Sequence, residues 1–173
     1  MSLTGIIVSG FVFAALLNVA EGRTPAPNNG TERDVVAQVI HDSICWALTK
    51  DKELQWSTMA KDEDLTIIWT SSNGNARGWK EFVRLFDTFM DPRFKATLTQ
   101  IRDLSISFSR SGDVAWFSAT LDDLGEWDGA PVGDRNIRWT GVLEKRDGHW
   151  LFVQQHGSVA KDAVPRPAED PDE

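Results

Sequence analysis

The sequence predicts an α+β domain in which helices come first along the chain and then pack against one face of a curved antiparallel sheet. One change of pattern along the chain carries this prediction. Before residue 93, apolar side chains recur every three or four residues, as in amphipathic helices; after it, apolar and polar side chains alternate, as in half-buried strands. Helices segregated from strands along a chain favour an α+β layout. A strongly bent sheet that is closed by helices forms a cone with a central pocket, which is a natural place for a ligand.

The first predicted helix covers residues 32–50. Its start carries a capping box, with Thr31 followed three residues later by Asp34 in place of the usual Glu or Gln. Val36 and Ile40 begin an apolar stripe at helical spacing.

Two helices and one strand are predicted to follow. Residues 51–60 indicate a shorter helix, and the β-branched residues in 64–72 indicate a strand. After a loop, Phe82 and its apolar neighbours form a strongly amphipathic helix that ends at Pro92.

Two hairpins are predicted in the second half. A two-residue turn at Ser111–Gly112 would place Ile106 opposite Phe117 and Phe108 opposite Ala115, so that the apolar faces coincide. The Asp147–Gly148 turn is the strongest hairpin signal in the chain. Its register predicts the opposite pairs Trp139 with His156, Gly141 with Gln154, and Leu143 with Phe152. These residues would share one face with Trp150.

The composition is that of one globular domain and argues against several classes of partner. The 173 residues carry a net charge of −8. Nucleic acid and anionic membrane surfaces are bound through Lys and Arg clusters, so we expect neither partner. The single Cys45 cannot form an internal disulfide, and the three histidines have no metal-ligand spacing. We therefore expect neither a metal nor another cofactor.

The chain ends differ from the domain between them. Residues 5–20 are apolar but short for a membrane span, and they fit the hydrophobic region of a secretory signal. We expect residues 1–22 to be a signal peptide or anchor, and the protein to be secreted or periplasmic (cytoplasmic if this segment is not a true signal). Residues 23–31 are predicted to be a linker, 32–162 the folded domain and 163–173 a disordered acidic tail.

Three stretches carry a resemblance to a known family. They are "NARGWKEFVRLFD", "GDVAWFSATLDD" and "VLEKRDGHWLFVQQHGS". Together they resemble the SnoaL-like branch of the nuclear transport factor 2-like superfamily, over residues 32–160. The resemblance implies the cone fold, and it implies function only broadly, because the superfamily includes ketosteroid isomerases, polyketide cyclases and members that only bind or assemble. It also implies a homodimer through the sheet. Relatives often have a histidine where this chain has Gln154.

His156 and Asp123 are the candidate catalytic residues. In the predicted register His156 faces an aromatic pocket, where it would either contact a ligand or be a hydrogen-bonded core histidine. Asp123 lies on the same side of its strand as Leu121, so it would face the cone, whereas Asp122 would point away. The resemblance to polyketide cyclases implies that such a carboxylate abstracts a proton next to a carbonyl. Arg138 would lie on the face opposite Asp123, which argues against an epoxide hydrolase site.

Three functions remain open from the sequence. The leading one is binding of a small apolar or aromatic molecule in the cone, with the predicted lining residues Trp46, Trp69, Phe117, Trp139, Gln154 and His156. The second is a lyase, cyclase or isomerase acting on a polyketide- or terpene-like substrate, with His156 as acid/base and Asp123 as its partner. The third is a dimeric assembly module without ligand. Trp116, among serines, suits a sheet-to-sheet contact.

Overall fold

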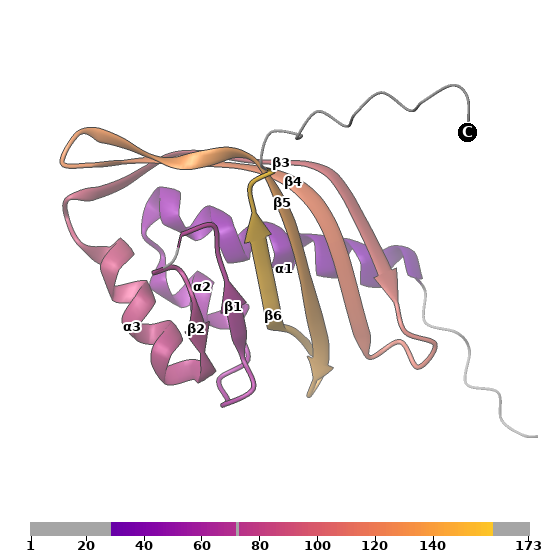
Figure 1. Cartoon of the computed structure of the whole chain (residues 1–173). Helices are drawn as coiled ribbons and strands as arrows, with labels where there is room; N and C mark the ends of the chain where they lie inside the picture. Colours follow the sequence, from indigo (N-terminus) through magenta and orange to yellow (C-terminus); the bar gives the residue numbers. More distant parts are fainter. Residues whose placement is uncertain (1–28, 72, 161–173) are drawn as a thin grey trace, which may run out of the picture.

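The computed structural model describes residues 29–71 and 73–160 (Figure 1). The predicted signal or anchor and the predicted acidic tail lie outside the described residues. The helices are α1 (Asn29–Thr49), α2 (Lys52–Ser57) and α3 (Gly78–Met90). The strands are β1 (Thr66–Ile68), β2 (Ala76–Arg77), β3 (Phe94–Phe108), β4 (Val114–Trp127), β5 (Ala130–Arg146) and β6 (His149–Ser158).

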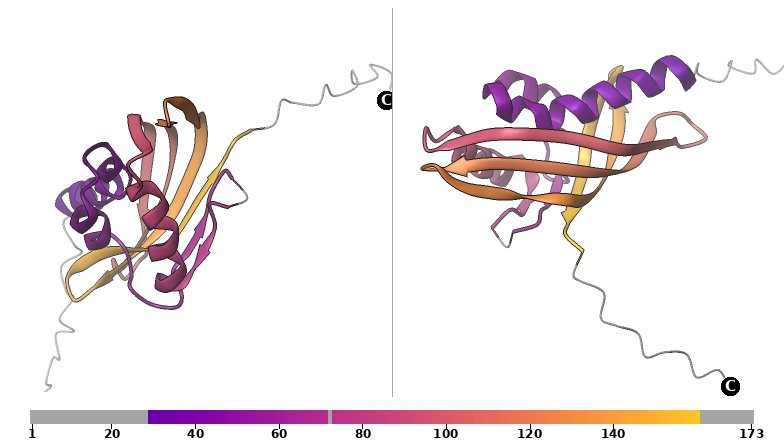
Figure 2. Two further views of the ribbon diagram at one scale, coloured as in Figure 1. Left: turned by 90° about the vertical axis from the view of Figure 1, so that its left-hand side faces the viewer. Right: turned by 90° about the horizontal axis from the view of Figure 1, so that it is seen from above.

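The strands form one curved sheet, and the helices lie against its concave side. The strand order is β2-β1-β6-β5-β4-β3, in which only the β1–β6 pair is parallel. Figure 2 shows α1 running along one side of the long strands, while α3 lies beside β1 and β2. The predicted α+β cone is therefore confirmed.

The first two helices differ from their predicted limits for local reasons. Helix α1 begins at Asn29, inside the predicted linker, because the apolar stripe marks where a helix packs and not where its backbone bonding starts. Helix α2 ends at Ser57 because the chain then bonds to β6: Phe152 N donates to Thr58 O at 2.8 Å, and Ala60 N donates to Phe152 O at 2.9 Å.

The core lies between α1, α3 and the concave face of the sheet. Alternate residues of β4 and β5 supply it, as a half-buried antiparallel sheet requires. Its largest fully buried side chains include Trp139, Phe86, Phe152 and Ile40. Trp139 and Phe117 pack edge to face with ring centroids 4.9 Å apart.

The β3–β4 hairpin has the predicted register, with Ile106 opposite Phe117 and Phe108 opposite Ala115. The β5–β6 hairpin has the predicted register only near its turn. Leu143 pairs with Phe152 as predicted, but a bulge follows, in which Val153 is the extra residue of β6.

The bulge reverses which side chains of β6 face the core. Beyond it, Trp139 pairs with Gly157 and Thr140 with His156. Because side chains alternate along a strand, one extra residue exchanges the two faces. Gln155 and Gly157 are consequently buried. The predicted placement of Gln154 and His156 on the core face is wrong.

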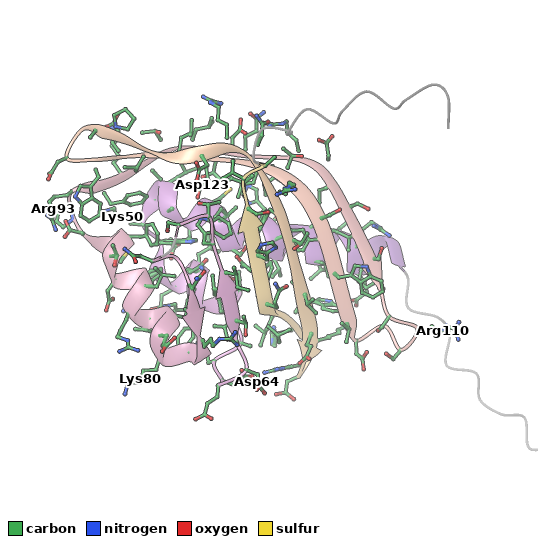
Figure 3. The ribbon with its side chains drawn as sticks, in the orientation of Figure 1. Lys50, Asp64, Lys80, Arg93, Arg110 and Asp123 are labelled. Carbon is green, nitrogen blue, oxygen red and sulfur yellow. The ribbon has the colours of Figure 1, made fainter. Side chains whose placement is uncertain are left out.

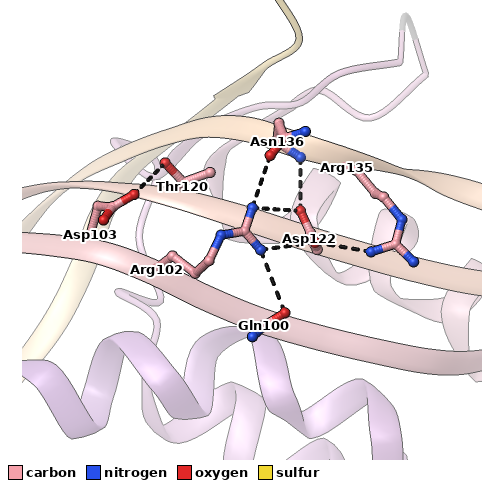
Figure 4. A network of polar contacts seen from close by, with 7 residues as sticks. All are labelled: Gln100, Arg102, Asp103, Thr120, Asp122, Arg135 and Asn136. Carbon is pink, nitrogen blue, oxygen red and sulfur yellow. Dashed lines mark hydrogen bonds and ion pairs between the residues drawn. The ribbon is translucent and has the colours of Figure 1, made fainter.

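A charged network lies on part of the outer face of the sheet (Figure 4). Asp122 accepts hydrogen bonds from Arg102 at 2.9 and 3.0 Å, from Arg135 at 3.1 Å, and from the backbone N–H of Asn136 at 2.8 Å. These partners hold the pKa of Asp122 well below its usual range, the Arg102 hydrogen bonds being the largest cause. Asp122 thus points away from the cone, as predicted.

Candidate functional site

A cavity of about 240 Å³ lies between the helices and the concave face of the sheet. Its lining residues come from every helix, from β1, β3, β4 and β6, and from the segments that follow α2 and β1. They are Ser43, Ile44, Trp46, Ala47, Gln55, Met59, Ile67, Trp69, Ser71, Asn73, Gly74, Phe82, Leu85, Phe86, Thr88, Phe89, Phe94, Asp123 and Gln155. The volume is slightly below the usual range for drug-sized ligands, so the cavity fits a small molecule.

Aromatic rings form much of the cavity wall because the apolar stripes of α1 and α3 face each other. Trp46 stacks on Phe86 with ring centroids 4.4 Å apart, and its edge meets Phe89 at 6.4 Å. Phe89 in turn packs against Phe94 at 5.1 Å. Offset and edge-to-face arrangements of this kind make a rigid apolar wall. Such a wall favours a flat or apolar ligand.

Asp123 is the only ionisable side chain among the described residues that line the cavity. It follows Phe117, Ala119 and Leu121 on the inward-facing side of β4, and in Figure 3 it lies between the long strands and the helices. Burial raises the pKa of its carboxyl from an ordinary 3.8 to about 6; the Thr99 hydroxyl opposes the shift, and the charge of Asp134 adds to it. A carboxyl with this pKa is a base at neutral pH that accepts a proton more readily than an exposed aspartate.

Two buried glutamines supply further polar groups. Gln55 and Gln155 are each 4% exposed. Gln155 Nε2 contacts the sulfur of Met59 at 3.9 Å, and Gln55 Oε1 is buried without a hydrogen-bond partner among the described residues. Ser43, by contrast, donates its hydroxyl to the carbonyl of Ile40 at 2.8 Å. The glutamine amides therefore have unused hydrogen-bonding capacity.

The structure brings together only some of the predicted site residues. Trp46, Trp69 and Asp123 line the cavity. Phe117 and Trp139 are 3% and 0% exposed and belong to the core behind the wall, where Trp69 meets Trp139 edge to face at 6.5 Å.

Gln154 and His156 do not line the cavity, because the β6 bulge turns them to the other face. Gln154 instead borders a hollow on the outer face, beside Trp116. The predicted pairing of His156 with Asp123 does not occur, since the two side chains lie on opposite faces of the sheet.

Sequence reasoning missed Gln55 and Gln155. Gln155 lies in the predicted final strand, where alternation puts it on the face opposite Gln154 and His156, and no local pattern marks the bulge that turns it inward. The sequence did contain a signal for Gln55, because it is a polar residue inside the apolar part of a short helix.

No group of three or more potential metal-ligating side chains is found among residues 29–71 and 73–160. None of the helices in that part of the chain is both long and apolar enough to cross a membrane.

Comparisons with known proteins support the fold. The model of the SnoaL-like domain family matches residues 36–162. A search of curated proteins returned no match.

Many solved structures are similar at low identity. A candidate dehydratase of the nuclear transport factor 2-like family from Streptomyces avermitilis aligns with a TM-score of 0.65 and 18% identity, over 76% of this chain and 98% of that one. A hexachlorocyclohexane dehydrochlorinase aligns with a TM-score of 0.60 and 18% identity, over 82% and 97%. A nuclear transport factor 2-like protein from Cytophaga hutchinsonii aligns with a TM-score of 0.60 and 16% identity, over 74% and 98%. At these identities the likeness concerns the fold.

Proposed function

The chain belongs to the SnoaL-like domain family, and from this premise we propose that its cone binds a small, largely apolar molecule on which Asp123 transfers a proton. The observation that carries the proposal is a carboxyl of pKa about 6 in an aromatic cavity. A carboxyl whose pKa is raised by burial is a common device for acid–base chemistry near neutral pH.

The reaction class follows from what one carboxylate can do. Asp123 takes a proton from a carbon next to a carbonyl, which leaves a neutral carboxylic acid and a delocalised enolate. Return of that proton to another carbon completes an isomerisation, and loss of a leaving group completes an elimination. We therefore propose a lyase or an isomerase. Two of the similar structures are named as a candidate dehydratase and a dehydrochlorinase, and both names denote elimination reactions.

This proposal differs from the sequence hypothesis in the identity of the base. His156 has no part in it, because its side chain lies on the outer face of the sheet, opposite Thr140. Asp123 acts alone among the described lining residues.

Binding without turnover is the second candidate function. It is favoured by one observation: apart from Asp123, the described lining holds no ionisable group to act as a second acid or base. Mechanisms that need two such groups are therefore not supported.

Hydrogen exchange on a simple ketone separates the two candidates. We would incubate the full-length protein with 2-tetralone in D2O and follow the α-hydrogens by NMR. We expect catalysed exchange whose rate falls as the pH drops below about 6, because protonation removes the base.

Variants assign the exchange to the base. Asp123→Asn should lose catalysed exchange, whereas Asp128→Asn, the same change at an exposed turn, should keep it. Binding of 2-tetralone without exchange at any pH would instead support the binding function. A small molecule carried through purification, detected by native mass spectrometry, would identify the natural ligand class.

A further inference from the structure

The two buried glutamines cost the fold stability, because they lie in a cavity wall that is mostly apolar. An amide taken from water into an apolar site costs free energy unless its polar atoms regain hydrogen bonds. Gln55 Oε1 has no partner within the described residues, and the amide of Gln155 has one weak contact, to a sulfur. An apolar residue of similar size would avoid this cost. The amides are therefore placed for a partner that enters the cavity.

The glutamines belong to one part of the cavity wall. Gln55 precedes Met59 by four residues, and the sulfur of Met59 contacts the amide of Gln155. Backbone hydrogen bonds between Phe152 and the segment after α2 hold this part of the chain against β6.

Asp123 belongs to another part of the wall. It lies on β4 opposite Thr99 of β3, and β5 separates β4 from β6 in the sheet. A ligand that fills the cavity thus meets a carboxylate in one place and a pair of amides in another.

We propose that Gln55 and Gln155 are specificity-determining residues that bind an uncharged hydroxyl group of the ligand. A hydroxyl donates one hydrogen bond and accepts others. The carbonyl oxygen of an amide can accept the first, and its NH2 group can donate the others. Rotation of the amide about its last torsion selects which of the two faces the ligand.

The cavity favours an uncharged group at this position. An ionised ligand group would need an opposite charge once it left water, and the described lining supplies none to an anion. The substrate class is therefore a small, uncharged ring compound with a hydroxyl group distant from the carbon that loses its proton. The position of that carbon rests on the proposed function of Asp123; the hydroxyl site does not.

A matched pair of probes tests the hydroxyl site. We would titrate the full-length protein with 2-tetralone and with 6-hydroxy-2-tetralone, which adds one hydroxyl at the far end of the ring system. Quenching of tryptophan fluorescence reports binding, since Trp46 and Trp69 line the cavity. We expect the hydroxylated probe to bind about tenfold more tightly, as one hydrogen bond to an otherwise unpaired buried group allows.

Substitution of the glutamines should abolish this preference. Gln55→Met and Gln155→Met keep the volume and remove the amide, so each should bring the two affinities closer and the double variant should make them equal. Binding of 2-tetralone is the internal control for folding, because it needs no amide. If a Met variant fails to fold, Gln55→Asn keeps an amide but withdraws it by one methylene, and it should also reduce the preference.

The outcomes separate this inference from the proposed function. Asp123→Asn should lose hydrogen exchange and keep the hydroxyl preference. A preference without exchange in the unmodified protein would contradict only the role of Asp123. Equal affinities in the unmodified protein, a preference that survives in the double Met variant, or one that disappears in Asp123→Asn would overturn the inference. Binding of neither probe would overturn both proposals.

Discussion

At the scale of single residues, the carboxyl of Asp123 is held in a state that costs stability. Its pKa is raised from 3.8 to about 6, chiefly by burial. A raised pKa means that the folded protein favours the protonated carboxyl more than the unfolded chain does. The folded state is therefore penalised where the carboxyl is ionised. This penalty is absent below about pH 4, grows as the pH rises to about 6, and is constant above.

Removal of the charge should consequently stabilise the protein, while it abolishes the proton transfer that we propose. For Asp123→Asn we expect a gain in the free energy of unfolding at pH 8 of at most about 3 kcal/mol, since each pKa unit corresponds to about 1.4 kcal/mol. The gain should vanish near pH 4, where the carboxyl is protonated in the folded protein. Urea unfolding of both proteins at the two pH values measures it. A variant that is less stable than the unmodified protein at pH 8 would show that the ionised carboxylate is well solvated or paired.

At the scale of elements, the final hairpin shows both the reach and the limit of sequence reasoning. Alternation and the Asp147–Gly148 turn predicted the pairing of Leu143 with Phe152, and the structure confirms it. The following bulge at Val153 leaves no mark in the pattern, because both glutamines and the histidine after it are polar. Alternation can place residues only while the register is unbroken.

Asp123 was assigned to the cone correctly because β4 alternates without interruption from Ala115 to Leu121.

Close backbone packing accompanies the bulge, and it can be tested at Gly141. A Cβ on this residue would lie 2.6 Å from the Phe117 ring, 2.8 Å from the Gln154 carbonyl oxygen and 2.9 Å from the Phe152 ring. Two of these neighbours are buried rings and the third is backbone, so none yields easily. We expect Gly141→Ala to lower the free energy of unfolding by roughly 2–3 kcal/mol, as overpacked cores do. Thr140→Ala, at the exposed neighbouring position, is the control and should change it by much less. Similar unfolding curves for the two variants would mean that the bulge is not tightly packed.

At the scale of the whole molecule, the two faces of the sheet have different chemistry. The concave face is apolar and holds the cavity. The outer face combines the Asp122 network with small polar residues around Trp116, whose exposed fraction is 46%. A large aromatic side chain exposed on a sheet of small residues is typical of a protein–protein contact. The helices cannot cover this face, because they all lie against the concave side (Figure 2).

We propose that two copies of the chain pair through this outer face, with Trp116 at the centre of the contact. Sedimentation equilibrium should then give twice the mass of one chain. Trp116→Arg should shift the protein to monomers, since it places a positive charge in the contact and adds it to Arg102 and Arg135 on the same face. Leu48→Arg makes the same kind of change at a residue that is 47% exposed on α1, away from the outer face, and should leave the mass unchanged. A monomeric unmodified protein would refute the pairing. A Trp116→Arg variant that stays dimeric would move the contact to another surface. Ligand binding should be retained in either variant, because the cavity lies on the concave side of the sheet.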